Sequence, residues 1–358
     1  MTKEFIVLGE LHQDLYYESD FYDKLVEKIT TKILNFIHHN PDDLNSGIVH
    51  RLITQAFSEI PKKIEAQSYI KRGGNGNNSA DYISRLEIPT RLISVIGRDC
   101  GWMISELKSN GINTDYIIQQ DASTPISTII KSKFTTKIYI APNLKQKMNF
   151  EGVNITEEAF ENAKIIFTTP ISSKFKELFE MGESLGLITA FTIEAQNIQS
   201  LDQLSNLIGE TKDIFFLNLN DAKVILGENL SLDIIDEKLS QLAKVRVYTA
   251  GENGSYTFTD NFQIHHPSFK VKDVIDLTGA GDSYAAGFLS KIYELVNDRF
   301  HFQEYTKKER IKEFEYILKE SMKFGTIISL YKITKQTTLS KTEIDEFIKQ
   351  IEKSEINN

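Results

Sequence analysis

Residues 274–289 read VIDLTGAGDSYAAGFL and combine a short apolar run, a glycine-rich turn and the start of a helix. The apolar run ends at Asp276, and helical spacing of small and apolar residues begins after Asp282. A helix N-terminus offers unpaired backbone N–H groups and the positive end of the helix dipole. Glycine also lets the backbone approach a ligand closely. The stretch therefore predicts an anion site, suited to a phosphate group in transfer.

A carboxylate, Asp282, stands where this glycine turn meets the helix. Phosphoryl transfer needs positioning, charge neutralisation and a group that accepts the proton of the attacking hydroxyl. A carboxylate beside the anion site can accept that proton. An ordinary turn would explain an isolated Gly-x-Gly, but the longer pattern Asp-x-Thr-Gly-x-Gly-Asp at residues 276–282 favours a functional loop.

Outside this stretch, short runs rich in β-branched and aromatic residues alternate with segments of helical spacing. The runs lie at residues 5–8, 92–96, 165–168, 187–193, 214–219 and 245–248. Strands that are apolar throughout and alternate with amphipathic helices are typical of a parallel sheet covered on both faces. The sequence therefore predicts a doubly wound α/β fold.

Two regions depart from this alternation. Residues 126–141 alternate apolar and polar side chains, which is typical of an exposed hairpin with one apolar face. We expect a small β-sheet lid built from about residues 12–18, 64–72 and 125–142. An inserted helical hairpin is expected at about 20–60, where apolar residues recur at every fourth position around the turn NPDDLNSG. The hairpin either packs over the lid or binds a partner, and the whole chain, 1–358, is expected to form a single domain.

The composition excludes several classes of protein. A net charge of −9 argues against a nucleic-acid binder but leaves room for an anionic substrate at a local basic site. One cysteine, Cys100, cannot form an intramolecular disulfide. No signal peptide and no apolar stretch of about 20 residues is evident, so we expect a cytoplasmic protein that does not contact a membrane.

The segment DLTGAGD resembles the C-terminal signature of the ribokinase-like (PfkB) carbohydrate kinases, which usually reads DTxGAGD. RGGNGNNSADYISRL at residues 72–86 resembles their N-terminal GGxxxN motif, with matches at Gly73, Gly74 and Asn78. ISVIGRDCG, at residues 93–101, is similar to the strand and turn that follow in the family. The resemblance covers nearly the whole chain apart from the inserted hairpin and the last helix.

The resemblance implies roles at matching positions. Asp282 would be the catalytic base, and the amides of Gly279, Ala280 and Gly281 would form the anion hole. Thr278, in the same loop, joins the residues expected to bind nucleotide and Mg²⁺. The family often binds a monovalent cation, such as K⁺, near the loop at Asp276.

Two further motifs would serve the nucleotide. Asn218 and Asp221, in FLNLNDAKVILG, resemble the Asn-x-x-Glu motif that organises Mg²⁺ and phosphate. Asp is shorter than Glu by one methylene, a gap that a water can bridge. The turn YTAGENGSY matches the family's TxGxxG turn beside the nucleotide; the matching residues are Thr249, Gly251 and Gly254. A helix cap and a structural turn are the alternative interpretations of these two motifs.

On the acceptor side, Asp14 lies where the family places a substrate-binding aspartate after the first strand. Its carboxylate can accept hydrogen bonds from two sugar hydroxyls, and Gly73, Gly74 and Asn78 would join it in binding the acceptor. The alternative interpretation of Asp14 is a solvated loop aspartate. His12 is interpreted as a bystander. Basic residues near the lid either hold a substrate phosphate or form a solvated face; they are Lys71, Arg72, Lys131, Lys133 and Lys137.

The sequence therefore predicts a kinase that transfers the γ-phosphoryl group of ATP to a hydroxyl of a sugar or sugar derivative. Mg²⁺ is expected to arrive with the nucleotide, since no cluster of side chains has metal-ligand spacing. A nucleoside kinase of the same fold is the alternative, and would need an apolar slot for the base. A catalytically silent regulator is a third interpretation, although Asp282, Gly279 and Gly281 are all present. A homodimer through the lid or the hairpin is also expected.

Overall fold

The computed structural model describes residues 2–40, 43, 45–132, 136–145, 147–198, 200–227, 230–271, 274–335 and 340–356. The chain divides into two compact units. The first comprises Met1–Leu11, Gly74–Ser123 and Met148–Asn358, and the second comprises His12–Gly73 and Thr124–Lys147.

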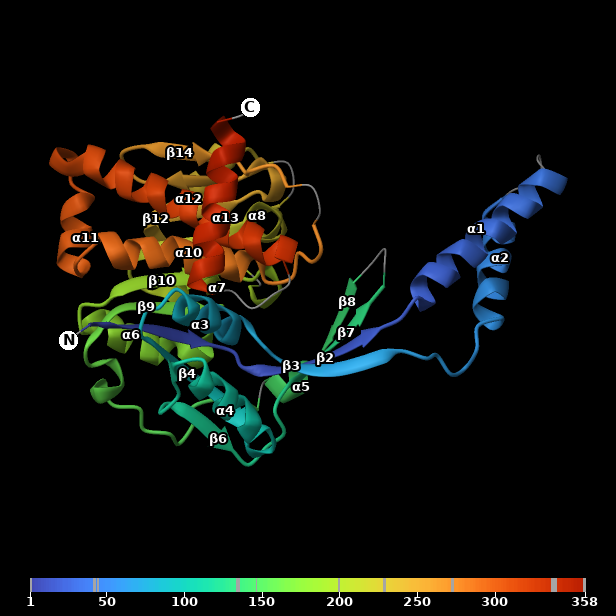
Figure 1. The fold of residues 1–358 in the computed structure, drawn as a ribbon, viewed down its shortest axis with the longest axis horizontal. Helices are drawn as coiled ribbons and strands as arrows, with labels where there is room; N and C mark the ends of the chain where they lie inside the picture. Colours follow the sequence, from blue (N-terminus) through green and yellow to red (C-terminus); the bar gives the residue numbers. More distant parts are fainter. Residues whose placement is uncertain are drawn as a thin grey trace. The chain divides into compact units, whose positions relative to one another are not determined.

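A ten-stranded sheet forms the centre of the first unit, in the order β14-β13-β12-β11-β10-β9-β1-β4-β5 with β6 beside β4 (Figure 1). Its strands are β1 (Glu4–Gly9), β4 (Thr90–Gly97), β5 (Ile112–Asn113), β6 (Ile117–Gln120), β9 (Ala163–Thr169), β10 (Ile188–Thr192), β11 (Lys212–Asn218), β12 (Ala243–Thr249), β13 (Ser255–Phe258) and β14 (Gln263–His266). Neighbouring strands run parallel except at β12–β13 and β13–β14. All six predicted strand runs lie in this sheet, which confirms the doubly wound class.

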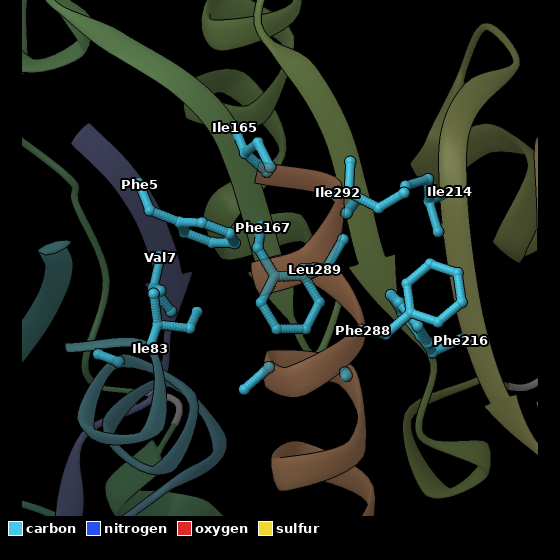
Figure 2. Packing of buried hydrophobic residues seen from close by; sticks show 14 of the residues in the cluster. Phe5, Val7, Ile83, Ile165, Phe167, Ile214, Phe216, Phe288, Leu289 and Ile292 are labelled. Carbon is cyan, nitrogen blue, oxygen red and sulfur yellow. The ribbon is translucent and has the colours of Figure 1, made fainter. Parts of the chain in front are cut away.

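Helices cover both faces of this sheet because its strands are apolar on both faces. On one face Phe5, Val7 and Phe167 pack with residues of α3 and α10 (Figure 2), and the same cluster includes residues of α4 and α12. On the other face Ile6 and Leu8 pack with α6, α7, α8 and α9. These helices are α3 (Asn75–Arg85), α4 (Gly101–Ser109), α6 (Lys176–Ser184), α7 (Leu201–Ile208), α8 (Leu219–Leu226), α9 (Leu232–Leu239), α10 (Ala280–Leu295) and α12 (Ile311–Lys335). Each fully buried phenylalanine contributes about 1.5–3 kcal/mol to stability.

Two more helices complete the first unit, α11 (Arg299–Tyr305) and α13 (Lys341–Ile356). Helix α13 packs on α12 through Ile344, Phe347 and Ile351, and the Phe347 ring meets Tyr331 edge-on at 5.4 Å. Helix α13 therefore carries one apolar stripe that joins the body of the unit.

The strand order reverses around β1, which has β4 on one side and β9 on the other. In open α/β sheets, ligands bind beyond the carboxyl ends of the strands at such a point. The end of β1 and the start of α3 approach closely there, because a Cβ on Gly9 would lie 2.4 Å from the Cα of Gly76. Only glycine at both positions permits this contact, which places the N-terminus of α3 at the reversal point.

A four-stranded sheet, β3-β2-β7-β8, forms the second unit. Its strands are β2 (His12–Glu18), β3 (Gln67–Gly73), β7 (Ile126–Lys131) and β8 (Thr136–Ile140), followed by the short helix α5 (Pro142–Lys145). The second small sheet expected from the sequence is present, with its edge strand β3 starting at residue 67 rather than at 64. Lys133 lies outside the described residues.

Between β2 and β3 the chain forms two helices, α1 (Phe21–His39) and α2 (Ser46–Ser58), which lie side by side in Figure 1. Asn45 caps α2, since its Oδ1 accepts a hydrogen bond from the N–H of Ile48 at 3.1 Å. Leu25, Leu52 and Ala56 are buried, whereas Val26 and Leu34 of α1 are 55% and 59% exposed. The predicted turn at residues 40–47 lies partly outside the described residues.

In the part of the chain that the structure describes, every helix is too short or too polar to cross a lipid bilayer.

Candidate active site

The glycine-rich turn leads directly into α10, as the sequence predicts. Gly279 has a φ of +76°, in the left-handed region that favours glycine, and is the residue before the helix. The side chain of Asp276 steadies the turn, because its Oδ1 accepts a hydrogen bond from the Thr278 N–H at 2.9 Å. A Cβ on Gly281 would meet no atom within 4 Å, so the first turn of the helix faces open space.

The predicted anion-hole amides differ from one another. The N–H of Ala280 donates to the carbonyl of Leu277 at 3.1 Å within the turn itself. The amides of Gly279 and Gly281 have no such backbone partner among the described residues. The two glycine amides are therefore better placed than Ala280 to receive phosphate oxygens.

Asn78 and Asp282 join the two signature segments. The Nδ2 of Asn78, on α3, donates a hydrogen bond to Oδ2 of Asp282, on α10, at 3.0 Å. The same Nδ2 atom would lie 3.8 Å from a Cβ on Gly279. Asn78, predicted to bind substrate, thus contacts the predicted base and borders the glycine turn. Two motifs from distant parts of the sequence form one site.

Tyr82 lies one helical turn after Asn78 on α3 and was not expected in the site. Burial raises the pKa of its hydroxyl, and the negative charges of Asp282 and Asp81 raise it further. The raised pKa keeps the phenol protonated, and its O–H available as a hydrogen-bond donor, to higher pH than in an ordinary tyrosine. Its position one turn from a signature residue is the only sequence signal that could have indicated it.

The next two strands bring together the predicted nucleotide residues. Asn218 ends β11, Thr249 ends β12, and the two pair in register. The Nδ2 of Asn218 lies 3.5 Å from Oγ1 of Thr249. Asn218 also caps α8, since its Oδ1 accepts from the N–H of Asn220 at 2.8 Å. The helix-cap interpretation therefore holds alongside any contact with nucleotide.

Asp221 lies in the first turn of α8, and burial raises the pKa of its carboxyl group. The cause is desolvation, which disfavours the charged form of the carboxyl group. A carboxylate in such a place is stabilised when a cation binds beside it.

The two glycines of the turn after β12 have different reasons to be glycine. Gly251 and Gly254 have φ values of +57° and +83°. A Cβ on Gly254 would lie 2.1 Å from the carbonyl oxygen of His266, whereas one on Gly251 would meet nothing within 4 Å. Packing therefore requires Gly254, and Gly251 alone has open space that a ligand could occupy.

Glu194 is a further polar residue at the carboxyl ends of the strands, and sequence reasoning missed it. It follows β10, and its Oε1 accepts a hydrogen bond from the Nδ2 of Asn75 at 2.6 Å. Its Oε2 accepts from the Nδ2 of Asn197 at 3.1 Å. An acidic residue directly after an apolar strand run was the available signal.

Asp14 and Gly73 belong to the second unit, whereas Gly74, Asn78 and Asp282 belong to the first. The Asp14 side chain is only 14% exposed, so it is not a solvated loop aspartate. A Cβ on Gly73 would lie 2.2 Å from Cγ of Asp14, which means that the carboxylate fills the space opposite this glycine.

Lys71, one of the basic residues that the sequence places near the lid, is exposed. It lies over the stacked rings of Tyr16 and Tyr69, with Nζ at 5.5 and 4.9 Å from their centroids.

A family model described as pfkB family carbohydrate kinase matches residues 53–343. The chain belongs to this family. Membership confirms the resemblance drawn from the two signatures and makes the protein a carbohydrate kinase, an ATP-dependent phosphotransferase with an alcohol group as acceptor.

Named relatives include both acceptor classes expected for a pfkB kinase. A ribokinase of Staphylococcus aureus (strain COL) is 28% identical over 62% of this chain and 74% of its own length. A nucleoside kinase of Methanocaldococcus jannaschii is 26% identical over 66% of this chain and 77% of its own length. The solved ribokinase of Giardia lamblia has the same fold, with a TM-score of 0.72, 15% identity and coverage of 98% of this chain and 99% of that one.

Proposed function

We propose that Asp282 is the base through which this pfkB kinase phosphorylates a hydroxyl group of a sugar or sugar derivative. The observation that carries the proposal is the 3.0 Å hydrogen bond from Asn78 to Asp282, made beside the left-handed Gly279. It holds a carboxylate at the start of a 16-residue helix, next to amides suited to a phosphate. These are the parts that phosphoryl transfer requires.

In the proposed reaction, the acceptor hydroxyl gives its proton to the carboxylate of Asp282 while its oxygen bonds to the γ-phosphorus of ATP. The bond from that phosphorus to the β,γ-bridging oxygen breaks, and ADP leaves. The N–H groups of Gly279 and Gly281 stabilise the negative charge on the transferring phosphoryl oxygens. Asn78 restrains rotation of the Asp282 side chain by binding its Oδ2, which keeps the base in one orientation.

The nucleotide is proposed to bind near Asn218, Thr249 and Gly251, with Thr278 at the phosphate end. Asp221 and Asn218 suit Mg²⁺, which prefers oxygen ligands and keeps several waters when it is bound with phosphates. The desolvated carboxylate of Asp221 supports this assignment, since a cation would offset its burial. When bound, Mg²⁺ would neutralise phosphate charge. Among the described residues, no three His, Cys, Asp or Glu side chains are grouped to hold a metal on their own.

The second unit is proposed to act as the acceptor lid of a single kinase domain spanning residues 1–358. Its Asp14 carboxylate would accept hydrogen bonds from two acceptor hydroxyls, with Gly73 beside it. Asp14 suits this role because it is largely buried, and its position is fixed by Gly73 on the neighbouring strand.

A nucleoside acceptor is the second candidate, and one observation favours it. The rings of Tyr16 and Tyr69 stack with centroids 4.9 Å apart, on the same face of the sheet as Asp14. Such a pair offers an aromatic surface on which a base can stack. The sugar assignment remains the leading one because the family model is that of carbohydrate kinases.

Three finer properties complete the proposal. A monovalent cation such as K⁺ is expected to bind at the loop of Asp276 and to raise the rate in KCl relative to choline chloride. The protein is proposed to be cytoplasmic, without contact with membrane or nucleic acid. A homodimer through the lid or the helical hairpin is proposed from the exposed Val26 and Leu34.

A coupled assay of ATP consumption over pentoses, hexoses, sugar acids, sugar phosphates and nucleosides tests the proposal. We expect turnover on at least one sugar class that depends on Mg²⁺ and is lost in the Asp282→Asn protein. Turnover on nucleosides alone would favour the second candidate. If no acceptor raises ATP consumption above the rate of ATP hydrolysis measured without acceptor, both candidate functions are contradicted.

A further inference from the structure

His12, the first residue of β2, is buried and contacts the carboxylate of Asp14. The residue is only 8% exposed. Its Nε2 lies 3.2 Å from Oδ1 of Asp14 and 3.1 Å from Oγ of Ser127. His12 is interpreted as a bystander from its sequence context, but in the structure it lies directly against Asp14, the proposed acceptor-binding residue.

The geometry of the sheet explains why these groups meet. His12 and Asp14 are two residues apart on β2, so their side chains lie on the same face. Ser127 of β7 pairs with Asp14, and Gly73 of β3 pairs with His12. Because Gly73 has no side chain, the Asp14 carboxylate occupies the space where a Cβ would otherwise lie, within 2.3 Å of its atoms. The carboxylate is therefore confined between a glycine and an imidazole.

Hydrogen-bond chemistry fixes the role of each ring nitrogen. An ionised carboxylate only accepts hydrogen bonds, so the Nε2 of His12 must carry the hydrogen that binds Asp14. The other nitrogen, Nδ1, is buried and has no hydrogen-bond partner among the described residues. A buried polar atom without a partner costs stability. An apolar residue would avoid that cost, so the useful property of His12 is the donor at Nε2.

We propose that His12 is a positioning residue for acceptor binding. Its Nε2–H holds Oδ1 of Asp14, so that the carboxylate meets the acceptor hydroxyls in one orientation. His12 acts through Asp14 and does not itself touch the acceptor. The inference rests on the proposed function, in which Asp14 binds the acceptor.

Two amide substitutions separate positioning from simple packing. In His12→Gln, the amide nitrogen can reach the place of the imidazole Nε2, so the donor to Asp14 is kept. In His12→Asn, the shorter side chain places its amide nitrogen near the former Nδ1, so that donor is lost. Both variants are uncharged and polar, which makes each a control for the other.

The test measures acceptor KM, kcat and ATP affinity for the parent and both variants, on whichever acceptor the parent phosphorylates. We expect His12→Asn to raise acceptor KM about ten- to a hundredfold, the usual effect of losing a hydrogen bond to a charged group. ATP affinity by calorimetry should stay within about twofold of the parent, and His12→Gln should restore most of the acceptor KM. In an Asp14→Asn background, His12→Asn should add little further loss.

An unchanged acceptor KM in His12→Asn would overturn the inference, as would an equal rise of acceptor KM in His12→Gln.

If the His12→Asn protein fails to fold, Ser127→Ala provides the test. In that variant Asp14 is the one contact of Nε2 that remains among the described residues, so acceptor KM should equal or fall below that of the parent. A raised KM would show that His12 serves Ser127 instead. If the parent phosphorylates no acceptor, both the proposed function and this inference are wrong. If the parent is active and the His12 variants have its acceptor KM, only the inference is wrong.

Discussion

Asn78 donates a hydrogen bond from Nδ2 to Oδ2 of Asp282 at 3.0 Å, across 204 positions of sequence. Replacing Asp282 with asparagine keeps its size but removes both the proton acceptor and its negative charge. We expect kcat to fall by about 10²–10⁴, the usual range for a lost general base. ATP should bind as well as before or more tightly, because a negative charge near the phosphates is gone. Coupled turnover and calorimetry measure the two effects, and a variant within a few-fold of the parent rate would exclude Asp282 as the base.

Asn78, the donor of this hydrogen bond, allows a milder substitution to be compared with Asp282→Asn. Asn78→Ala removes the restraint on Asp282 but leaves the base in place. We expect kcat to fall by about ten- to a hundredfold, the usual effect of losing one hydrogen bond to a charged group, and the melting temperature to change little. Single-turnover rates measured with saturating ATP and acceptor provide the readout. A loss as large as that in Asp282→Asn would mean that Asn78 does more than orient the base.

The turn after β12 allows a matched pair of glycine substitutions. Gly254→Ala places a methyl group 2.1 Å from the His266 carbonyl oxygen, so the protein should melt at a clearly lower temperature. Gly251→Ala meets open space and should cost only the roughly 1–2 kcal/mol of a left-handed backbone. If nucleotide approaches Gly251, the second variant should instead raise the KM for ATP. Equal melting temperatures and equal ATP KM values would contradict the division of roles between the two glycines.

The negative charge of Asp221 should lower the stability of the nucleotide-free protein at neutral pH. Because burial raises its pKa in the folded state, the folded protein binds this proton more tightly than the unfolded chain. The cost is absent at pH values below the unfolded pKa, grows as pH rises through the folded pKa, and is complete above it. Asp221→Asn should therefore raise the free energy of unfolding at pH 7 and make little difference in acid.

The same substitution should weaken the binding of Mg²⁺ with ATP. Urea unfolding between pH 4 and 7 and calorimetry with and without Mg²⁺ measure the two effects. A variant that is less stable than the parent at pH 7 would contradict the stability prediction. Unchanged binding of Mg²⁺ with ATP would remove Asp221 from the nucleotide site.

The helical hairpin offers one buried and one exposed set of apolar residues. Serine at Leu25, Ile29 and Ile33 should lower the melting temperature or the solubility, because Leu25 is only 7% exposed and the two isoleucines are half-buried. Serine at Val26 and Leu34 should instead lower the mass measured by light scattering, if the hairpin joins two copies. The second pair should leave the melting temperature of a monomer unchanged. Unchanged mass and unchanged melting temperature in both variants would rule out a packing or dimerising role.

Much of the fold could be predicted from the sequence because its strands are apolar throughout and its helices are amphipathic. Asp282 could also be predicted, since the glycine turn and the helix start are local features. Glu194 and Tyr82 could not, because each depends on which distant segment packs alongside. The enclosure of His12 and Asp14 could not either, because Gly73 and Ser127 on the neighbouring strands provide it. The engagement of the Ala280 amide within its own turn was missed for a different reason. It depends on the backbone conformation of the loop, which residue types alone do not fix.

Glu18 and Gln67 stand opposite each other at the far ends of β2 and β3, so residues 19–66 leave the sheet and rejoin it at adjacent positions. The pairing from His12 to Glu18 continues without a register shift. A segment attached in this way can be gained, lost or exchanged in one genetic event without altering the strands that carry it. The junction is thus a natural graft point. A domain whose two termini lie close together could be spliced there without interrupting the pairing of β2 with β3.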